Sequence, residues 1–118
     1  MITLTLDKAK ELLAEAVAEK GEDFVYVNRD GRPVAGLTGA DCHYVHGDQP
    51  GCIVGHVLHK AGVSLADLSE YEGQGAEDPA LDLAGATDDA CRLLSYAQEN
   101  QDRGIPWGES VRLALAYM

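Results

Sequence analysis

The fold of this chain is decided by residues 87–118, TDDACRLLSYAQENQDRGIPWGESVRLALAYM. Thr87 and two aspartates open an apolar stripe of helical spacing, as expected for a helix whose N-terminus is capped by a hydroxyl and favoured by negative charge. That helix ends at Arg103 and Gly104, and Pro106 suits the first position of a second helix. The stretch therefore predicts two helices joined by a short break, an αα-hairpin.

Two earlier segments also have helical periodicity. Residues 5–21, TLDKAKELLAEAVAEKG, carry apolar side chains on one face, and residues 51–62, GCIVGHVLHKAG, carry a broad apolar arc. Each segment ends at a glycine that suits a left-handed C-terminal cap. Ser64 caps a further turn of helix, and residues 79–84, PALDLA, suit one more turn inside an acidic connection.

A small β element is expected between the first two helices. Residues 24–27, FVYV, have the aromatic and β-branched character of a strand, and residues 42–45, CHYV, suit a second short strand. Their pairing predicts a β-hairpin near residues 24–46 with a connection longer than two residues. The following HGDQPG is interpreted as a break before the next helix.

The fold class expected from these segments is mostly α (α+β), in a single domain that spans residues 1–118. About four helices surround one core, together with the small β-hairpin and the C-terminal αα-hairpin. A chain of 118 residues with 46% apolar residues suits one modest core. The residues expected in that core are Leu12, Leu13, Val17, Phe24, Ile53, Val54, Val57, Leu58, Leu93, Leu94, Trp107, Val111 and Leu115.

Composition excludes several classes of function. The formal net charge is −11, from 9 Lys and Arg against 20 Asp and Glu, and phosphate backbones are bound by Lys and Arg, so we expect no direct nucleic-acid binding. No run approaches the ~18 apolar residues of a membrane-spanning helix. The N-terminal residues lack the pattern of a secretory signal, and the odd number of cysteines, three, favours reduced thiols. We therefore expect a cytoplasmic protein.

The acidic residues are unevenly distributed. Between Lys60 and Arg92 the sequence has no Lys or Arg but contains eight acids: Asp67, Glu70, Glu72, Glu77, Asp78, Asp82, Asp88 and Asp89. Such a stretch serves solubility, or it forms a docking face for a protein partner with a basic surface. Both interpretations stay open from the sequence alone.

All four histidines and two of the three cysteines lie in residues 41–62. On a helical wheel Cys52, His56 and His59 share one face, opposite the apolar arc, and this spacing suits a zinc site if a nearby residue supplies a fourth ligand. The alternative is structural, since Cys52 also packs as a small hydrophobe while the two histidines face water. In a third interpretation the small residues of this face, with Gly55 among them, allow a close helix crossing.

Cysteine-dependent catalysis is a further hypothesis. Cys42 or Cys52 beside a histidine supplies a nucleophile and a base by residue type. The sequence contains no nucleophile elbow, P-loop, dinucleotide fingerprint or HExxH motif, so enzymatic activity is the less favoured interpretation. No cofactor other than zinc is expected.

Two segments carry a family resemblance. In residues 50–68 the pattern is a C-x-x-G-x-x-L helix, and in residues 97–114 it is a polar, Gly/Pro and Trp junction between two helices. The matching positions are Cys52, Gly55 and Leu58, then Asn100, Asp102, Gly104, Pro106 and Trp107. With this pattern the chain resembles small helical proteins of unknown function from actinobacteriophages and actinobacteria. The resemblance implies a helical domain with an accessory role and assigns no catalytic residue.

The function expected from the sequence is that of a small acidic interaction protein, a phage-encoded modulator that binds a host protein. The alternatives are a zinc-binding regulator that uses Cys52, His56 and His59, and a cysteine-dependent enzyme. The C-terminal αα-hairpin is also suited to form a homodimer.

Overall fold

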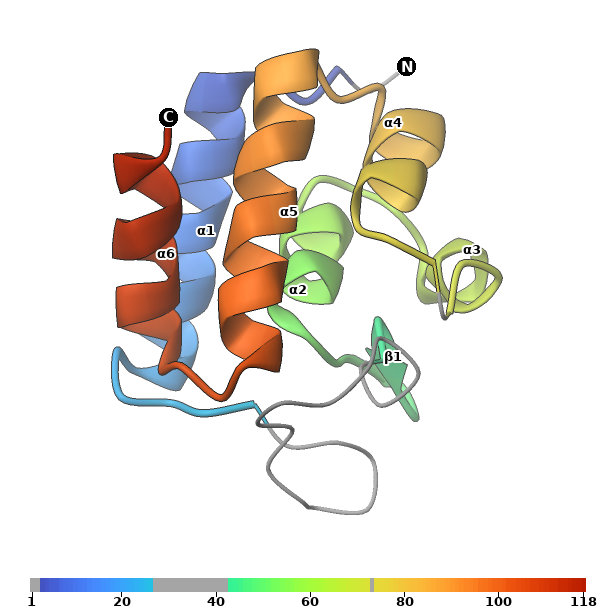
Figure 1. Cartoon of the computed structure of the whole chain (residues 1–118). Helices are drawn as coiled ribbons and strands as arrows, with labels where there is room; N and C mark the ends of the chain where they lie inside the picture. The colour runs from blue at the N-terminus through green and yellow to red at the C-terminus, as the bar shows by residue number, and fades with distance from the viewer. Residues whose placement is uncertain (1–2, 27–42, 73) are drawn as a thin grey trace.

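A computed structural model describes residues 3–26, 43–72 and 74–118 of the chain. The fold is mostly helical with a small antiparallel hairpin, as the sequence predicts (Figure 1). The elements are α1 (Leu6–Lys20), β1 (Val45–His46), β2 (Gln49–Pro50), α2 (Ile53–Lys60), α3 (Leu65–Ser69), α4 (Glu77–Ala84), α5 (Asp88–Asp102) and α6 (Trp107–Ala116). The four expected helices are α1, α2, α5 and α6, while the two expected helical turns are the short helices α3 and α4.

Helix α5 is the central element of the fold. It packs against α6, α1, α2 and α4, and in Figure 1 it stands between α6 on one side and α4 on the other. The Thr87 hydroxyl accepts a hydrogen bond from the Ala90 N–H at the start of α5, and Gly104 follows its end with a φ of +84°. The predicted αα-hairpin is therefore confirmed, with the predicted cap and the predicted turn glycine.

Helices α1 and α2 also begin and end close to the predicted residues. Thr5 caps α1 through the Lys8 N–H, and Gly21 ends it with a φ of +97°. Gly62, with a φ of +109°, ends α2, and the Val63 N–H returns to the Leu58 carbonyl at 3.0 Å. This bond is the one expected for a left-handed glycine cap.

The β-hairpin lies later in the chain than predicted. Residues 24–26 form no strand, and the observed pairing joins Val45 to Pro50 and His46 to Gln49. The reason is the two-residue turn at Gly47 and Asp48, where Gly47 has a φ of +62°. A glycine at the first position of such a turn allows a tight hairpin, so HGDQPG forms the hairpin itself. Residues 27 and 42 of the predicted pairing lie outside the described residues.

The core contains most of the predicted residues. Trp107 is fully buried, with its ring edge-on to Phe24 at 4.8 Å between centroids, as expected of an anchor. Phe24 and Val111 are only half-buried, and Leu115 is exposed. Leu115 differs from the prediction because α6 lies at the edge of the helix layer and packs mainly against α5 (Figure 1). In the part of the chain that the structure describes, no helix is long and apolar enough to cross a membrane.

Candidate functional site

Cys52 lies at the N-cap of α2 and is completely buried. Its backbone is extended, with φ −72° and ψ 173°, so it precedes the helix and does not belong to its regular spiral. Burial raises the pKa of the Cys52 thiol to about 12, which keeps it protonated near neutral pH. Burial also raises the pKa of Cys91. The Cys52 thiol is therefore a poor nucleophile, and Cys42 lies outside the described residues.

The two histidines of α2 have the same hydrogen-bond arrangement. His56 Nδ1 lies 3.0 Å from the Cys52 carbonyl, and His59 Nδ1 lies 3.0 Å from the Val63 carbonyl. A carbonyl oxygen only accepts, so Nδ1 carries the proton in both rings and Nε2 is the nitrogen with the lone pair when the ring is neutral. Burial lowers the pKa of His56, which favours its neutral form.

His56 and His59 line one cavity of about 450 Å³ between α1, α2 and the β1–β2 turn. Its lining also includes Asp48 and a close ion pair between Lys60 and Glu19. Cys52 is absent from this lining, so the structure separates the predicted line of three metal ligands into two histidines and a buried thiol. Among residues 3–26, 43–72 and 74–118, no three His, Cys, Asp or Glu side chains are grouped so that they could hold a metal ion. Zinc binding by these residues stays a hypothesis without a preformed site there.

Gly51, which precedes α2, and Gly55 within it lie against a backbone segment and not against another helix. A Cβ atom on Gly55 would overlap the Tyr44 carbonyl, and one on Gly51 would overlap the His43 carbonyl. The Gly51 N–H donates to the Tyr44 carbonyl at 2.8 Å, and the Cys52 N–H donates to the His43 carbonyl at 2.9 Å. The glycines therefore let the chain before β1 lie directly on the start of α2.

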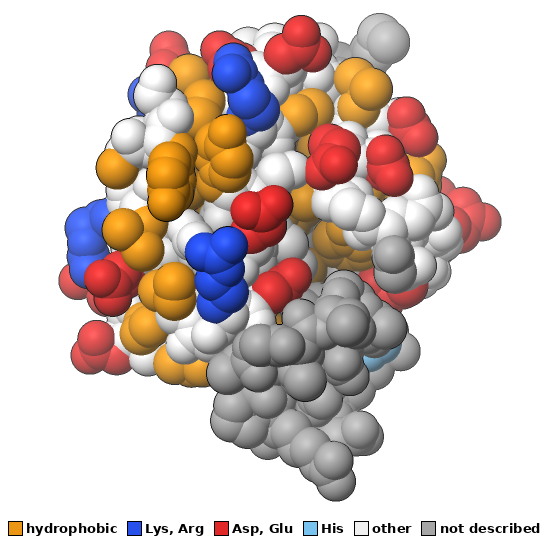
Figure 2. Space-filling view, in the orientation of Figure 1, with side chains coloured by type: hydrophobic (Ala, Val, Ile, Leu, Met, Phe, Trp, Pro, Cys, Tyr) orange, Lys and Arg blue, Asp and Glu red, His pale blue; other side chains and the backbone are white. Residues whose placement is uncertain are grey.

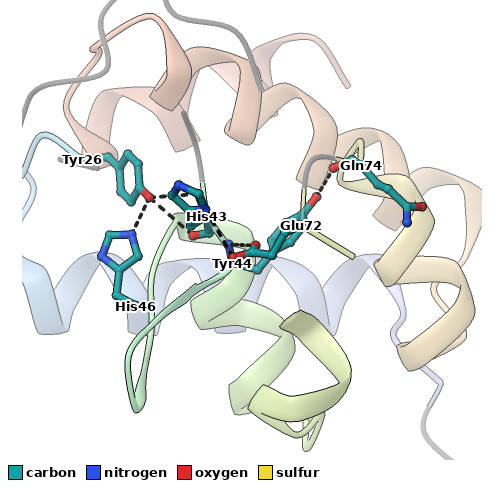
Figure 3. Close-up of polar contacts among 6 residues, drawn as sticks. All are labelled: Tyr26, His43, Tyr44, His46, Glu72 and Gln74. Atoms are coloured by element: carbon teal, nitrogen blue, oxygen red, sulfur yellow. Dashed lines mark hydrogen bonds and ion pairs between the residues drawn. The ribbon is translucent and has the colours of Figure 1, made fainter. Parts of the chain in front are cut away.

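A polar network holds this segment in place (Figure 3). The Tyr26 hydroxyl accepts from the His43 N–H at 3.0 Å and lies 2.6 Å from His46 Nε2. The Tyr44 N–H donates to Glu72 Oε1 at 2.5 Å, and the Glu72 Oε2 atom lies 3.4 Å from His43 Nδ1. Because Tyr26 is buried and the two histidines and Glu72 are partly buried, the network fixes residues 43–46 between the end of α3 and the segment after α1.

The eight acids of the sequence differ in their surroundings. Two of them are partly buried and serve the fold, since Glu72 accepts from the Tyr44 N–H, and Asp89 accepts from the Thr87 hydroxyl at 2.5 Å and from the Ala90 N–H at 2.9 Å. These hydrogen bonds, the Thr87 hydroxyl foremost, lower the pKa of Asp89. The other six are exposed: Asp67, Glu70, Glu77, Asp78, Asp82 and Asp88. We call these six residues, together with the exposed Leu81, the acidic face.

The acidic face lies on α3 and the residue that follows it, on α4, and on the first residue of α5. Figure 2 shows acidic side chains gathered on the side of the molecule that α3 and α4 form. Two of the six acids accept hydrogen bonds from neighbours, Glu77 from the Ser95 hydroxyl at 2.6 Å and Asp82 from the Tyr71 hydroxyl at 3.0 Å. Leu81 is 57% exposed, and no pattern in the sequence predicts its exposure because PALDLA contains apolar residues on both faces.

No family model, curated protein or solved structure matches this chain. The resemblance to actinobacteriophage proteins therefore stays a prediction.

Proposed function

We propose that this chain is a small, acidic, non-enzymatic binding protein whose partner is a protein with a basic surface. The partner contacts the acidic face. Stoichiometric binding through this face requires no catalytic group, and the buried Cys52 thiol is a poor nucleophile.

The observation that supports this proposal most is the position of Leu81 among the acids. Glu77 and Asp78 lie one turn before it on α4, and Asp82 follows it directly, so an exposed apolar side chain is surrounded by carboxylates. Protein interfaces combine an apolar centre with a polar rim, and charged rims accelerate the encounter with a partner of opposite charge. A basic amphipathic segment of a partner fits both parts of this surface. Its apolar side chains would contact Leu81, and its cations would pair with the surrounding carboxylates.

The distribution of cations supports the same face. Three ion pairs of the described residues join Lys8 to Glu11, Lys60 to Glu19 and Arg112 to Glu22, all away from the acidic face. Within residues 43–72 and 74–118, no Lys or Arg forms an ion pair with one of the six exposed acids. The negative electrostatic field of these carboxylates therefore stays available to attract a basic partner. Given the resemblance to phage proteins, we further propose that the partner is a protein of an actinobacterial host.

The test is quantitative affinity capture from an actinobacterial lysate with three forms of the chain. One is the natural sequence, and the second carries amides in place of the six acids of the acidic face. The third is a matched control with amides at six exposed acids on and just after α1, namely Asp7, Glu11, Glu15, Glu19, Glu22 and Asp23. The proposal expects a basic partner that the first and third forms retain and the second loses. Equal retention by all three forms, or equal loss by both variants, would contradict it.

A further inference from the structure

The C-terminal half of α6 exposes an unusual amount of apolar surface. Residues 113–118, LALAYM, are six consecutive apolar residues, and Ala114 is buried while the other five are exposed. Leu113, Leu115, Tyr117 and Met118 are 37–70% exposed, and Leu81 is the other large exposed hydrophobic side chain among the described residues. Exposed apolar runs of this kind mark contact surfaces in soluble proteins.

A groove lies between α1 and α6, on the flank of α6 that carries Val111 and Leu115. The Tyr117 ring lies on the other flank, where its centroid is 5.4 Å from that of the Tyr96 ring of α5. The volume of the groove is about 360 Å³, and its lining is mostly apolar, with Ala14, Ala18 and Val111 among the residues. Leu115 lies one turn after Val111 on the same side of α6, so a projecting side chain adjoins the groove. Figure 2 shows hydrophobic side chains gathered on the side of the molecule that α6 forms.

We propose that this surface, the α6 face, binds a second copy of the chain about a two-fold axis. A two-fold interface is self-complementary, because each copy presents the same patch. The α6 face meets this condition, since it combines projecting side chains with an adjacent groove that receives those of the partner copy. The inference is independent of the acidic face, which lies on the other side of α5 (Figure 1).

The distribution of charge favours a second copy of the chain as the molecule that binds the α6 face. The chain carries a net charge of −11, so most contacts between two copies are repulsive. Helix α6 is an exception, because its charged residues are Glu109 and Arg112, whose charges cancel. The groove also has one charge of each sign, Glu22 and Arg112, which lie 3.5 Å apart. Two copies thus meet at a neutral surface while their acidic faces point away from each other.

Sedimentation equilibrium measures this assembly directly. We expect the natural chain to have twice its monomer mass of 12.6 kDa, and the Leu113→Glu, Leu115→Glu double variant to have the monomer mass. Ala116→Glu, at another exposed position of α6, provides a second disruptive variant if the double variant unfolds. The control Leu81→Glu, which changes a more exposed leucine on α4, should remain dimeric.

Three results would overturn the proposal. The first is a natural chain that keeps the monomer mass up to millimolar concentration, and the second is an assembly larger than a dimer. The third is a dimer that persists in folded α6 variants or that Leu81→Glu dissociates as well. Circular dichroism of each variant shows whether it is folded.

Discussion

The backbone N–H of Ile53 donates to the Oε1 atom of Gln101 at 2.8 Å, so α5 supplies the cap that α2 does not make for itself. Cys52 at the N-cap forms no side-chain hydrogen bond to the helix. The other end of the Gln101 amide donates to Asp102 Oδ1 at 2.8 Å, which fixes its orientation. Because Gln101 is fully buried, this contact joins the start of α2 firmly to the centre of the fold.

Replacement of Gln101 by leucine should therefore destabilise the protein. The substitution keeps an apolar stem of similar size but leaves the Ile53 N–H buried without its acceptor, at a cost of about 1–3 kcal/mol. Urea unfolding measures the loss. The control is Glu99→Leu, an exposed position on the same helix, which should change the free energy of unfolding by less than about 0.5 kcal/mol. Equal effects of the two substitutions would show that the cap contributes nothing.

Replacement of Gly55 by alanine should destabilise the protein although it lies in a helix. An alanine in an unobstructed helix is about 1 kcal/mol more favourable than glycine. At Gly55 the added Cβ would overlap the Tyr44 carbonyl, a backbone atom that moves only if the segment before β1 moves. The matched control is Gly75→Ala, whose Cβ would meet the flexible carboxylate of Glu77. Thermal unfolding measures the effect. If Gly55→Ala is as stable as the natural chain, the close approach of Gly55 to the Tyr44 carbonyl is contradicted.

His56 should make the stability depend on pH. Burial lowers its pKa in the folded protein below the ordinary value of 6.5. Above pH 6.5 the ring is neutral in both states and contributes nothing, whereas below 6.5 the unfolded chain takes up the proton first. The free energy of unfolding therefore falls with pH below this value, by at most about 1.4 kcal/mol per pH unit.

The contribution of His56 is separated from that of other groups by comparison of variants. His56→Gln should show a weaker fall in the free energy of unfolding between pH 6.5 and about pH 5 than the natural chain. The assignment to His56 fails if its removal leaves the slope unchanged.

The cysteines should differ in their reaction with an alkylating reagent. Cys52 is buried and its pKa is raised to about 12, so it should react only when the protein unfolds. Cys91 is partly exposed and should react earlier, although burial raises its pKa too. Mass spectrometry of the peptides follows each cysteine separately. Rapid modification of Cys52 in the folded protein would instead support the hypothesis of cysteine-dependent catalysis.

Local signals in the sequence were sufficient to predict the four main helices. The hydroxyl caps at Thr5 and Thr87 act within three residues, and the glycines at 21 and 62 act at the helix ends, so the information lies inside each segment. The position of the β-hairpin is predicted wrongly because residues 24–27 have strong strand propensity. Residues 24–26 nevertheless form no strand in the structure. Propensity does not specify which segment supplies the partner.

The candidate site was harder to predict because its contacts are long-range. Gln101 and Ile53 are 48 residues apart, and Tyr26 and His46 are 20 apart, so no spacing rule connects them. A helical wheel assumes helical backbone at Cys52, where the backbone is extended, so it does not give the direction of this side chain. The acidic stretch was visible in the sequence, whereas the exposure of Leu81 within it depends on how α4 packs on α5.

Binding of a basic partner by the acidic face is tested by an NMR titration of the isotopically labelled chain with a Lys- and Arg-rich amphipathic helical peptide. Saturable shifts should be confined to the amides of α3, α4 and the start of α5, and they should weaken with added salt because the rim contacts are electrostatic. Replacement of Leu81 by asparagine should weaken the binding without moving its location. Shifts centred on the acids of α1, or shifts that spread over the whole surface without saturation, would contradict the account.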